Sequence, residues 1–474
     1  MKKKSNHIFI FLLLASVTGA CKKDLNNSPV NTYTDGNLIK DQQTAQAVLV
    51  GVYYRFADAG LDYTGLVSRW SRVNEFIPSE LAGSINISYN NGRDDSLGSF
   101  TFSPGFGDID SVWTYGYNLV NAANGFISNA TPANILPAST KRQMLAEARF
   151  LRAFGNSELL FNFGQYRDPS SKYGIILRDT FVIAANVNLP RTSVAAAYTS
   201  ILADLDLAIA GLPELNSAIY YANASTAKLL KARILMNRGT AGDYAQVIAL
   251  TKDLIANSPF TLEDSLKEIF LNKGLKSGEV MLGIQPYPDQ TYKGNLDGFA
   301  VTDGFAEGLA GDARSQWMIF YNTLWYPLPF YQSEKYYAGD DPAYPESTPL
   351  SECSYPFRLT EAYLLEAEAI TLSTGDLPTA RALLKTVLSH AGAGPQQMAA
   401  IDNATTPEAL QLEIVKENLR NFVNENGVDW LALRRLPFAT IQQLNPNIKA
   451  PHQLILPIPT AELIYNNVMQ NPGY

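Results

Sequence analysis

The sequence predicts a mostly α-helical chain in which helical hairpins form a scaffold and long irregular loops are inserted between them. Three observations predict this class. Apolar residues recur at helical spacing over much of the 474 residues, two distant helix–turn–helix stretches resemble each other, and two long regions rich in Gly, Pro and aromatic residues follow neither helical nor strand periodicity. A hydrophobic content of 46% is sufficient for a sizeable core.

Several helical stretches in the first half of the chain begin or end at recognisable signals. Residues 41–60 start at Asp41, a good N-cap, and residues 191–213 start at Thr192 or Ser193 and end in Gly-Leu-Pro. Two stretches place small and apolar side chains on one face, at Met144, Ala148, Leu151, Gly155 and Leu159, and at Tyr198, Ile201, Leu205 and Ile209.

Residues 226–255 and 358–388 are both predicted to form helix, turn and helix. Their turns contain Gly242-Asp243 and Gly375-Asp376, and small alanines in each first helix allow a close approach of its partner. This organisation is typical of tetratricopeptide-like hairpins. Because the two turns lie 133 residues apart, the array is interrupted.

Two irregular regions are predicted, around residues 60–107 and 274–355. The second contains the stretch WYPLPFYQSEKYY, from Trp325 to Tyr337, in which six of thirteen residues are aromatic and two are prolines. Segments this long are functional or disordered, and disordered tracts are poor in aromatic residues. We therefore expect ordered loops carried on the helical scaffold.

The N-terminus is predicted to be a lipoprotein signal. Residues 1–20 combine Lys2 to Lys4 with an apolar run from Ile8 to Val17, which is too short to span a bilayer. The small residues before Cys21 resemble a bacterial lipobox, although Thr18 stands where Leu is usual. We expect acylation of Cys21, a tether over 21–40 and a single body over 41–474, with no second long apolar run; a plain cleaved signal is the alternative.

Charge and cysteine content argue against several classes of protein. Removing residues 1–20 deletes three lysines and no acids, so 34 basic and 45 acidic residues leave a net charge of −11. An acidic body disfavours nucleic acid as a partner. Cys353 is left without a second cysteine, so no disulfide or cysteine-based metal site is expected, and no cofactor is predicted.

No catalytic motif is evident in the sequence. His390 and His452 lack the spacing of a zinc site or a partnered nucleophile, and no phosphate-binding glycine loop is present. Hydrolysis by two carboxylates remains an open alternative. The acids considered for hydrolysis fall into two groups. One group lies in a candidate loop and comprises Glu75, Glu80, Asp94 and Asp95, and the other is interpreted as lying on a helix surface and comprises Glu361, Glu366 and Glu368.

Six motifs in order along the chain resemble the RagB/SusD-like nutrient-uptake outer-membrane lipoproteins. They are Trp113, Tyr117, Asn121 and Asn124; Glu147 to Arg152; Asp312 to Arg314; Arg358 with Glu361 and the following Tyr-Leu; Glu425, Gly427 and Arg435; and the ending LPIPTAELIYNNVMQNPGY. Asn421 and Ala432 replace acids that the family usually carries. We interpret those acids as partners in scaffold ion pairs.

The resemblance implies a SusD-like fold and a non-catalytic receptor facing the cell surface from the outer membrane. It implies that an oligosaccharide, or alternatively a peptide, is captured and passed to a SusC-like TonB-dependent transporter. In the family the ligand face lies opposite the tetratricopeptide-like face. An alternative from a different functional class is a helical-repeat scaffold that binds other proteins and no small ligand. Only the helical hairpins support this alternative.

An aromatic ring suits a sugar because it covers the flat C–H patch while polar side chains bond the hydroxyls, and a pre-positioned ring loses little entropy. Trp113 and Trp430 fall in scaffold motifs and are expected in the core. The candidates for ligand contact lie in or beside the irregular regions, and each competes with a core role: Trp70, Tyr89, Asn90, Arg93, Tyr292, Trp317 and Trp325.

Overall fold

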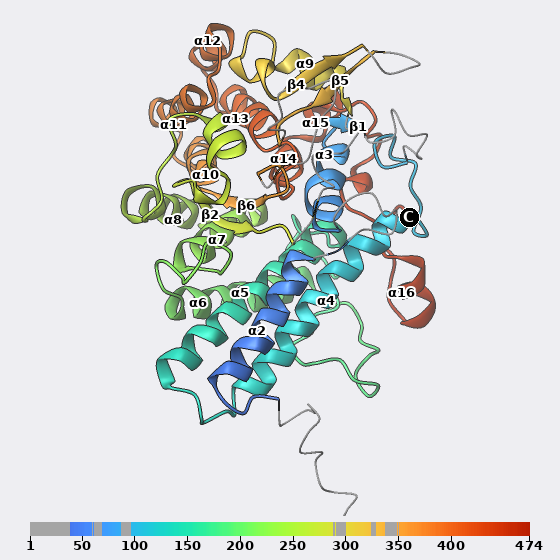
Figure 1. Cartoon of the computed structure of the whole chain (residues 1–474). Coiled ribbons are helices and arrows are strands. Elements are labelled where there is room, and N and C mark those ends of the chain that lie inside the picture. The colour runs from blue at the N-terminus through green and yellow to red at the C-terminus, as the bar shows by residue number, and fades with distance from the viewer. Residues whose placement is uncertain are drawn as a thin grey trace, which may run out of the picture.

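The protein is mostly α-helical, as predicted, with two small antiparallel sheets (Figure 1). The computed structural model describes residues 38–58, 60, 69–86, 96–287, 290, 300–323, 329–336, 348 and 350–474. The α-helices are α2 (Gln42–Ala57), α3 (Ile77–Leu81), α4 (Gly107–Ala130), α5 (Ala138–Phe163), α6 (Val194–Gly211), α7 (Ala224–Arg238), α8 (Asp243–Asn257), α9 (Asp303–Gly308), α10 (Leu359–Ser373), α11 (Leu377–Ala391), α12 (Pro395–Asn403), α13 (Pro407–Asn421), α14 (Val428–Leu433), α15 (Phe438–Leu444) and α16 (Thr460–Tyr465).

Short helices and strands complete the described chain. The short helices are η1 (Ser71–Phe76), η2 (Glu268–Lys273), η3 (Gly274–Lys276), η4 (Ala313–Gln316) and η5 (Pro451–Leu454). The strands are β1 (Ile85–Asn86), β2 (Val280–Ile284), β3 (Ala300–Val301), β4 (Ile319–Asn322), β5 (Phe330–Ser333) and β6 (Ser354–Arg358).

The first helices pack as a layer in which α2 and α5 both contact α4, and α6 packs on α5. Asp41 caps α2 by accepting a hydrogen bond from the backbone N–H of Thr44 at 2.7 Å, and Ser193 caps α6, which confirms both predicted starts. Gly116 of α4 is necessary for close packing, because a Cβ there would lie 2.6 Å from the side chain of Leu159 on α5.

The two predicted hairpins are present as α7–α8 and α10–α11. Gly242 and Gly375 adopt positive φ angles of 90° and 69°, which only glycine adopts without strain, and Asp376 caps α11. Helix α10 packs against both α7 and α8, so the hairpins are neighbours in space despite their separation in sequence. They occupy the left side of Figure 1, away from α16 and the C-terminus.

Helix α6 corrects one expectation. Within the described residues it is a helix long and apolar enough to cross a membrane by length and composition, whereas the sequence was expected to hold no second long apolar run. Its predicted stripe is confirmed, since Tyr198, Ile201 and Leu205 are fully buried. Ile209, the last residue of the stripe, is partly buried, and α6 packs this side against α5 and α7 while Leu207 on another side stays 51% exposed.

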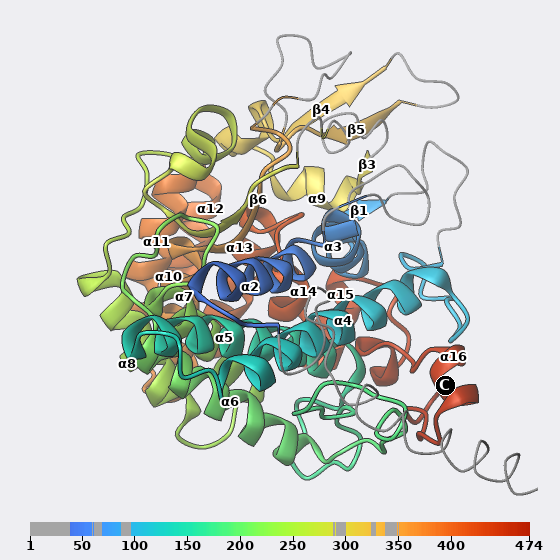
Figure 2. The ribbon, with the colours of Figure 1, turned by 60° about the horizontal axis from the view of Figure 1, so that its bottom comes forward.

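The second irregular region leaves and re-enters the scaffold at one place. Strand β2 pairs with β6, bringing Val280 opposite Arg358 at the base of the insertion. Beyond that base, β1, β3, β5 and β4 form an antiparallel sheet in that order. Strands β4 and β5 project beyond the helical body at the top of Figure 2.

The predicted irregular region 60–107 is partly helical. Residues 71–81 form η1 and α3, and the next residues reach β1, which pairs with β3 of the second insertion through Ile85 and Val301. The two insertions therefore meet in one sheet. One face of this sheet covers a small apolar cluster that includes Phe76, Phe305 and Met318.

Candidate functional site

The Arg358 motif lies in the buried scaffold. Arg358 is fully buried at the start of α10; its guanidinium lies 2.7 Å from Glu279 Oε1 and 2.6 Å from Glu425 Oε2. Lys335 also pairs with Glu425. Burial lowers the pKa of Arg358, but the charges of Glu425 and Glu279 outweigh it and leave the pKa above its ordinary value. This charged group joins the insertion to the helices.

Asn421 occupies one of the positions where the family usually carries an acid. Its side-chain oxygen accepts a hydrogen bond from Arg358 at 2.8 Å, and its amide donates to Glu417 at 3.1 Å. Glu417 in turn pairs with Arg314, which also binds Asp312 at 2.7 Å. Asn421 therefore still links two of the motifs within the scaffold. This agrees with the interpretation that the position has a scaffold role.

Other motif residues hold loops and helices in place. Asn121 accepts from the backbone N–H of Val182 at 2.8 Å, and Asn124 donates to two carbonyl oxygens in the same loop. Arg152 pairs with Asp204 at 2.7 Å. Trp113 and Trp430 are 6% and 3% exposed, which confirms their expected core positions. The motifs that carry the resemblance therefore stabilise the fold, and a ligand site must lie elsewhere.

The three glutamates of α10 correct a prediction. Glu361, Glu366 and Glu368 were expected on a helix surface, but they are 1%, 4% and 0% exposed. Glu361 lies 2.6 Å from Arg233 and Glu368 lies 2.6 Å from Arg435. Because α10 is surrounded by other helices, it has no polar face, and Glu361 and Glu368 are buried by pairing with arginines from α7 and the segment after α14. Glu366 has no arginine partner among the described residues, and burial raises its pKa.

Trp70 is also placed differently from the prediction. It is 2% exposed and packs in the core with its ring centroid 5.2 Å from that of Phe56, and its indole N–H donates to Glu75 at 3.2 Å. Trp70 is therefore not a ligand-facing residue, and Glu75 and Glu80 are buried in a helix rather than exposed on a loop. A helical stripe of Trp70, Val73, Ile77 and Leu81 was the signal that the sequence analysis missed.

Trp317 is half-buried at the end of η4. Its ring lies 6.3 Å from that of Phe270 and contacts two apolar clusters, one under the four-stranded sheet and one around Phe270. The other candidate positions, together with the acylation site and two candidate acids, lie outside the described residues: Cys21, Tyr89, Asn90, Arg93, Asp94, Asp95, Tyr292 and Trp325.

The described part of the insertion contributes an exposed aromatic pair that the sequence analysis did not single out. Tyr321 of β4 and Tyr331 of β5 are directly opposite each other in register, with ring centroids 4.9 Å apart. Tyr321 is 51% exposed, while Tyr331 is half-buried against the cluster below. The second ring therefore positions the first at the surface, close in sequence to Trp325.

A row of polar side chains lies on the other face of the same strands. Asn322 donates to Gln332 at 3.0 Å, and Gln332 donates to Glu334 at 2.9 Å. Burial raises the pKa of Glu334 to about 8, because the single hydrogen bond from Gln332 does not compensate for the loss of water. Within the described part of the chain, no donor reaches the second carboxyl oxygen of Glu334.

The sheet presents one exposed ring, Tyr321, which can offer an apolar face to a polyhydroxylated ligand. The side chains of Asn322, Gln332 and Glu334 lie on the opposite face and are buried, so they stabilise the strands and do not face a ligand laid on Tyr321. Among the described residues, no group of three His, Cys, Asp or Glu side chains could hold a metal ion. His390 lies in the last turn of α11, rather than in a loop, with Nε2 3.0 Å from Glu279.

Comparisons with known proteins agree with the fold described above. No protein-family model matches the chain. SusD-like protein P2 from Formosa agariphila is 23% identical over an alignment 536 positions long, which covers 100% of both proteins. A SusD superfamily protein from Bacteroides thetaiotaomicron has the same fold, with a TM-score of 0.74, 20% identity and coverage of 91% of this chain and 100% of that one.

The chain is SusD-like in fold and in sequence. A laminarin-binding SusD-like protein is a further structural neighbour, with a TM-score of 0.68, 20% identity and coverage of 92% of this chain and 100% of that chain. The resemblance predicted from six short motifs is thus confirmed over the whole length. The buried ion pairs of Arg358 and Arg314 lie at these motif positions. They join the helices to the insertion.

Proposed function

We propose that this SusD-like chain is a non-catalytic, cell-surface glycan receptor that passes its ligand to a TonB-dependent transporter. The observation that carries the proposal is the exposed ring of Tyr321, which is positioned by Tyr331 directly opposite it on the neighbouring strand. The laminarin-binding neighbour supports a glucan as the first ligand to test. Acylation of Cys21 would hold the protein in the outer membrane.

Ring stacking explains how the site would hold a sugar. A pyranose face laid on Tyr321 buries apolar area on both partners, and Tyr331 limits the motion of that ring before binding. Trp325, five residues before Phe330 in sequence, and Trp317 at the start of the hairpin are candidates to extend the platform along an oligosaccharide.

Calorimetric titration of the mature chain against laminarin and other oligosaccharides tests the proposal. Tyr321→Ala should weaken binding about fivefold to tenfold, since one lost ring contact is worth roughly 1 kcal/mol. A matched control is Tyr220→Ala, because Tyr220 is 39% exposed and pairs with Tyr221 at the same 4.9 Å on the connection between α6 and α7. Equal losses in both variants, or binding only of peptides, would contradict the proposal.

Acylation has its own test. Cys21→Ala should abolish lipid labelling and release the protein from the outer membrane, whereas globomycin should cause the unprocessed precursor to accumulate. Unchanged processing and membrane retention in Cys21→Ala would show that the signal is of the plain cleaved kind.

A further inference from the structure

A small pocket lies where the helical scaffold meets the insertion. It has a volume of about 220 Å³ and is lined by the turn between α3 and β1 and by residues of α9, α13 and α15. Lys416 and Arg420 of α13 are its charged residues, and no Asp or Glu lines it within the described part of the chain. We call it the Arg420 pocket. In a chain whose 45 acids outnumber its 37 Lys and Arg, a pocket lined by basic charges alone calls for an explanation.

The guanidinium of Arg420 is fixed in place but only partly used. Arg420 is 9% exposed, and its Nε donates to Glu417 Oε2 at 3.1 Å, while Glu417 is held from its other side by Arg314. Among the residues that the structure describes, no acceptor lies within hydrogen-bond distance of Nη1 or Nη2 of Arg420, and both atoms stay open to solvent. The donors of these two nitrogens are therefore available to a ligand in the pocket.

The charge arrangement favours a single carboxylate. Nη1 and Nη2 form a planar pair of donors that matches the two oxygens of a carboxylate, and such paired bonds are strong because both groups are charged. Lys416 already pairs with Glu413 at 2.8 Å and is 37% exposed, so it contributes little further attraction. A doubly charged anion would require more unpaired cations than the pocket supplies.

The rest of the pocket accommodates a small carbon body. Phe305, Leu419 and Leu444 give it apolar walls. Gly304 and Gly308 leave space beside them, since a Cβ built on either glycine meets no atom within 4 Å. Pockets for drug-sized ligands measure roughly 300–1,000 Å³, so this pocket suits a smaller molecule, of about one ring.

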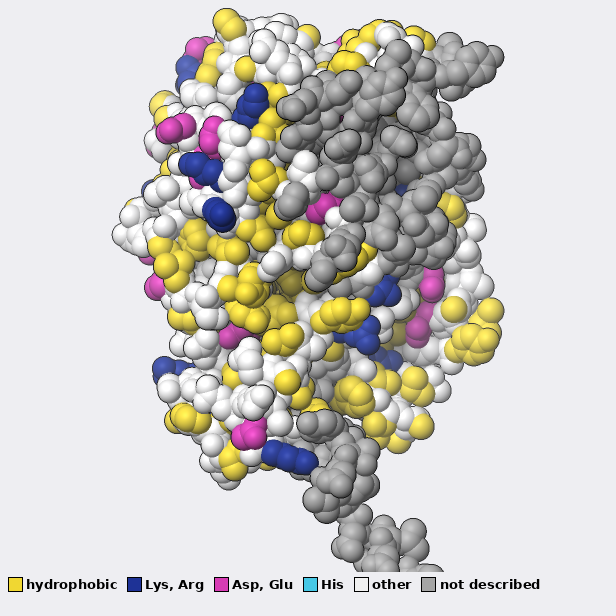
Figure 3. All heavy atoms as spheres, viewed as in Figure 1, with side chains coloured by type: hydrophobic (Ala, Val, Ile, Leu, Met, Phe, Trp, Pro, Cys, Tyr) yellow, Lys and Arg dark blue, Asp and Glu magenta, His cyan; other side chains and the backbone are white. Residues whose placement is uncertain are grey.

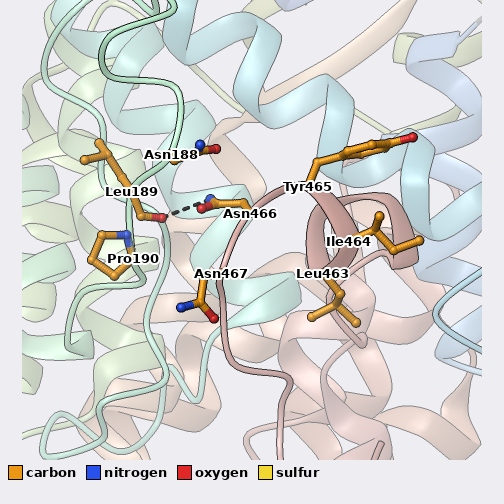
Figure 4. Close-up of a pocket in the computed structure, with 8 residues that line it drawn as sticks. All are labelled: Asn188, Leu189, Pro190, Leu463, Ile464, Tyr465, Asn466 and Asn467. Atoms are coloured by element: carbon orange, nitrogen blue, oxygen red, sulfur yellow. Dashed lines mark hydrogen bonds between the residues drawn. The ribbon is translucent and has the colours of Figure 1, made fainter.

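Other surfaces of the molecule lack this combination. The groove of about 580 Å³ in Figure 4 is lined by residues 188–190 and 463–467, none of them charged, and its Asn466 already donates to the carbonyl oxygen of Leu189 at 3.0 Å. On the face shown in Figure 3, Lys and Arg side chains are scattered in small groups over several elements. A polyanion is attracted by a broad basic patch, whereas one carboxylate needs only a well-placed guanidinium.

We propose that the Arg420 pocket binds the carboxylate of a small organic acid, such as a sugar acid. Nη1 and Nη2 of Arg420 donate to its two oxygens, and its carbon body lies against Phe305 and Leu419. This site is additional to the one proposed for a glycan. Ser84 of the pocket directly precedes β1, and strands β3 and β5 separate β1 from β4, which carries Tyr321.

Calorimetric titration of the mature chain with two acids tests the inference and distinguishes the source of the carboxylate. D-glucuronate or cyclohexanecarboxylate should bind with a Kd on the order of 1 mM. Tighter binding of the first identifies a sugar acid, and tighter binding of the second a plain organic acid. The uncharged methyl ester of the acid that binds should bind about tenfold more weakly or less. Binding of neither acid, equal binding of the ester, or binding of inorganic phosphate as tight as that of either acid would overturn the inference.

Two substitutions place the bound acid in the pocket. Arg420→Lys keeps the charge but loses the paired donors, and should weaken binding of the acid about tenfold. Gly308→Leu leaves the ion pair with Glu417 intact and should weaken binding by a similar factor, because the new side chain occupies open space at the pocket wall. The matched control is Gly51→Leu, since a Cβ on Gly51 of α2 also meets no atom within 4 Å but lies outside the pocket. Wild-type affinity in either variant, once its unfolding curve shows that it folds, would overturn the assignment.

Titration with laminarin separates this inference from the proposed glycan site. Arg420→Lys and Gly308→Leu should bind laminarin as the wild type does, and Tyr321→Ala should bind the acid as the wild type does. If laminarin fails to bind any variant or the wild type, the glycan proposal fails alone. Loss of laminarin binding in Gly308→Leu, with the wild type still binding it, would contradict the separation of the two sites.

Discussion

The helical scaffold and the four-stranded sheet handle buried charge in different ways, and two adjacent residues show the difference. Lys335 reaches the scaffold, where it pairs with Glu425 and donates to the carbonyl oxygens of Asn421 and Val423 at 2.8 and 2.9 Å. Glu334 stays with the sheet, where, among the residues that the structure describes, Gln332 is the only side chain that donates to it. Burial lowers the pKa of Lys335 to about 8, against the opposing charge of Glu425, and raises that of Glu334 to about 8.

This difference distinguishes the residues that specify the fold from the residues that are available to bind a ligand. In the scaffold, the buried motif arginines Arg314 and Arg358 are matched by carboxylates from other elements, so each of these motif residues depends on several others. In the sheet, Glu334 is buried with a single side-chain donor, and the ring of Tyr321 stays exposed. If the sheet binds the ligand, as proposed above, the ligand would cover that ring.

The largest expected effect comes from removing a scaffold charge. Arg358→Met leaves Glu279 and Glu425 buried with one partner fewer each, and should lower the free energy of unfolding by about 3–5 kcal/mol. Urea denaturation followed by circular dichroism measures this, and soluble yield should fall in parallel. A loss below about 1 kcal/mol would mean that the buried pairs do not hold the insertion to the helices.

The next effect concerns Glu334, which accepts a hydrogen bond from Gln332, and depends on pH. Because the pKa of Glu334 is raised from 4.5 in the unfolded chain to about 8, folding is favoured below pH 4.5 and this contribution is lost as the pH rises toward 8. Glu334→Gln keeps a neutral group that can still accept from Gln332. The variant should be more stable than the wild type at pH 9 by on the order of 3 kcal/mol and nearly equal to it at pH 4.

Unfolding curves at both pH values give this difference directly, and subtracting the wild type removes other groups with raised pKa values, such as Asp429 and Glu158. A constant difference between pH 4 and pH 9 would show that Glu334 is as well solvated as a surface acid.

Substitution of two tryptophans is expected to have smaller effects, and these effects test the comparison between the scaffold and the sheet. Trp317 is half-buried between apolar clusters, so Trp317→Ala should cost about 2 kcal/mol of stability as well as any glycan affinity. Trp325→Ala should lower glycan affinity about tenfold with less than roughly 0.5 kcal/mol of destabilisation, if its ring meets the ligand as the sequence predicts. Paired titration and urea experiments separate the outcomes, and a loss of stability alone at position 325 would assign that ring to the core.

The smallest effect is expected at an exposed ion pair. Lys385 and Asp402 join α11 to α12 with side chains that are 38% and 62% exposed. Lys385→Met should change the unfolding free energy by less than about 1 kcal/mol and lose even that difference in high salt. A loss as large as that of Arg358→Met would remove the distinction between matched buried charges and ordinary surface pairs.

Much of the scaffold could be predicted because its signals are local. Apolar spacing of three and four residues and the turns at Gly242 and Gly375 specify the hairpins without knowledge of distant partners. The burial of Glu361 and Glu368 could not be predicted this way, since it depends on Arg233 and Arg435, more than 60 residues away.

The sheet was harder to predict than the helices. Strands β1 and β3 have two residues each and pair across more than 200 positions of sequence, so neither has a readable alternation. The helix from Trp70 to Leu81 was missed because its apolar stripe lies next to Pro78 inside a region dominated by Gly and Asn. Aromatic content correctly marked the second insertion, but the exposed pair Tyr321–Tyr331 depends on strand register, which composition does not give.

Hydrogen exchange with and without a bound glycan tests most directly whether binding belongs to the sheet and not to the scaffold. We expect ligand to slow amide exchange in peptides covering β4 and β5, and to leave α7–α8 and α10–α11 unchanged. Protection confined to the helical hairpins, with β4 and β5 exchanging at the same rate as in the free protein, would contradict the division between a structural scaffold and a ligand-binding sheet.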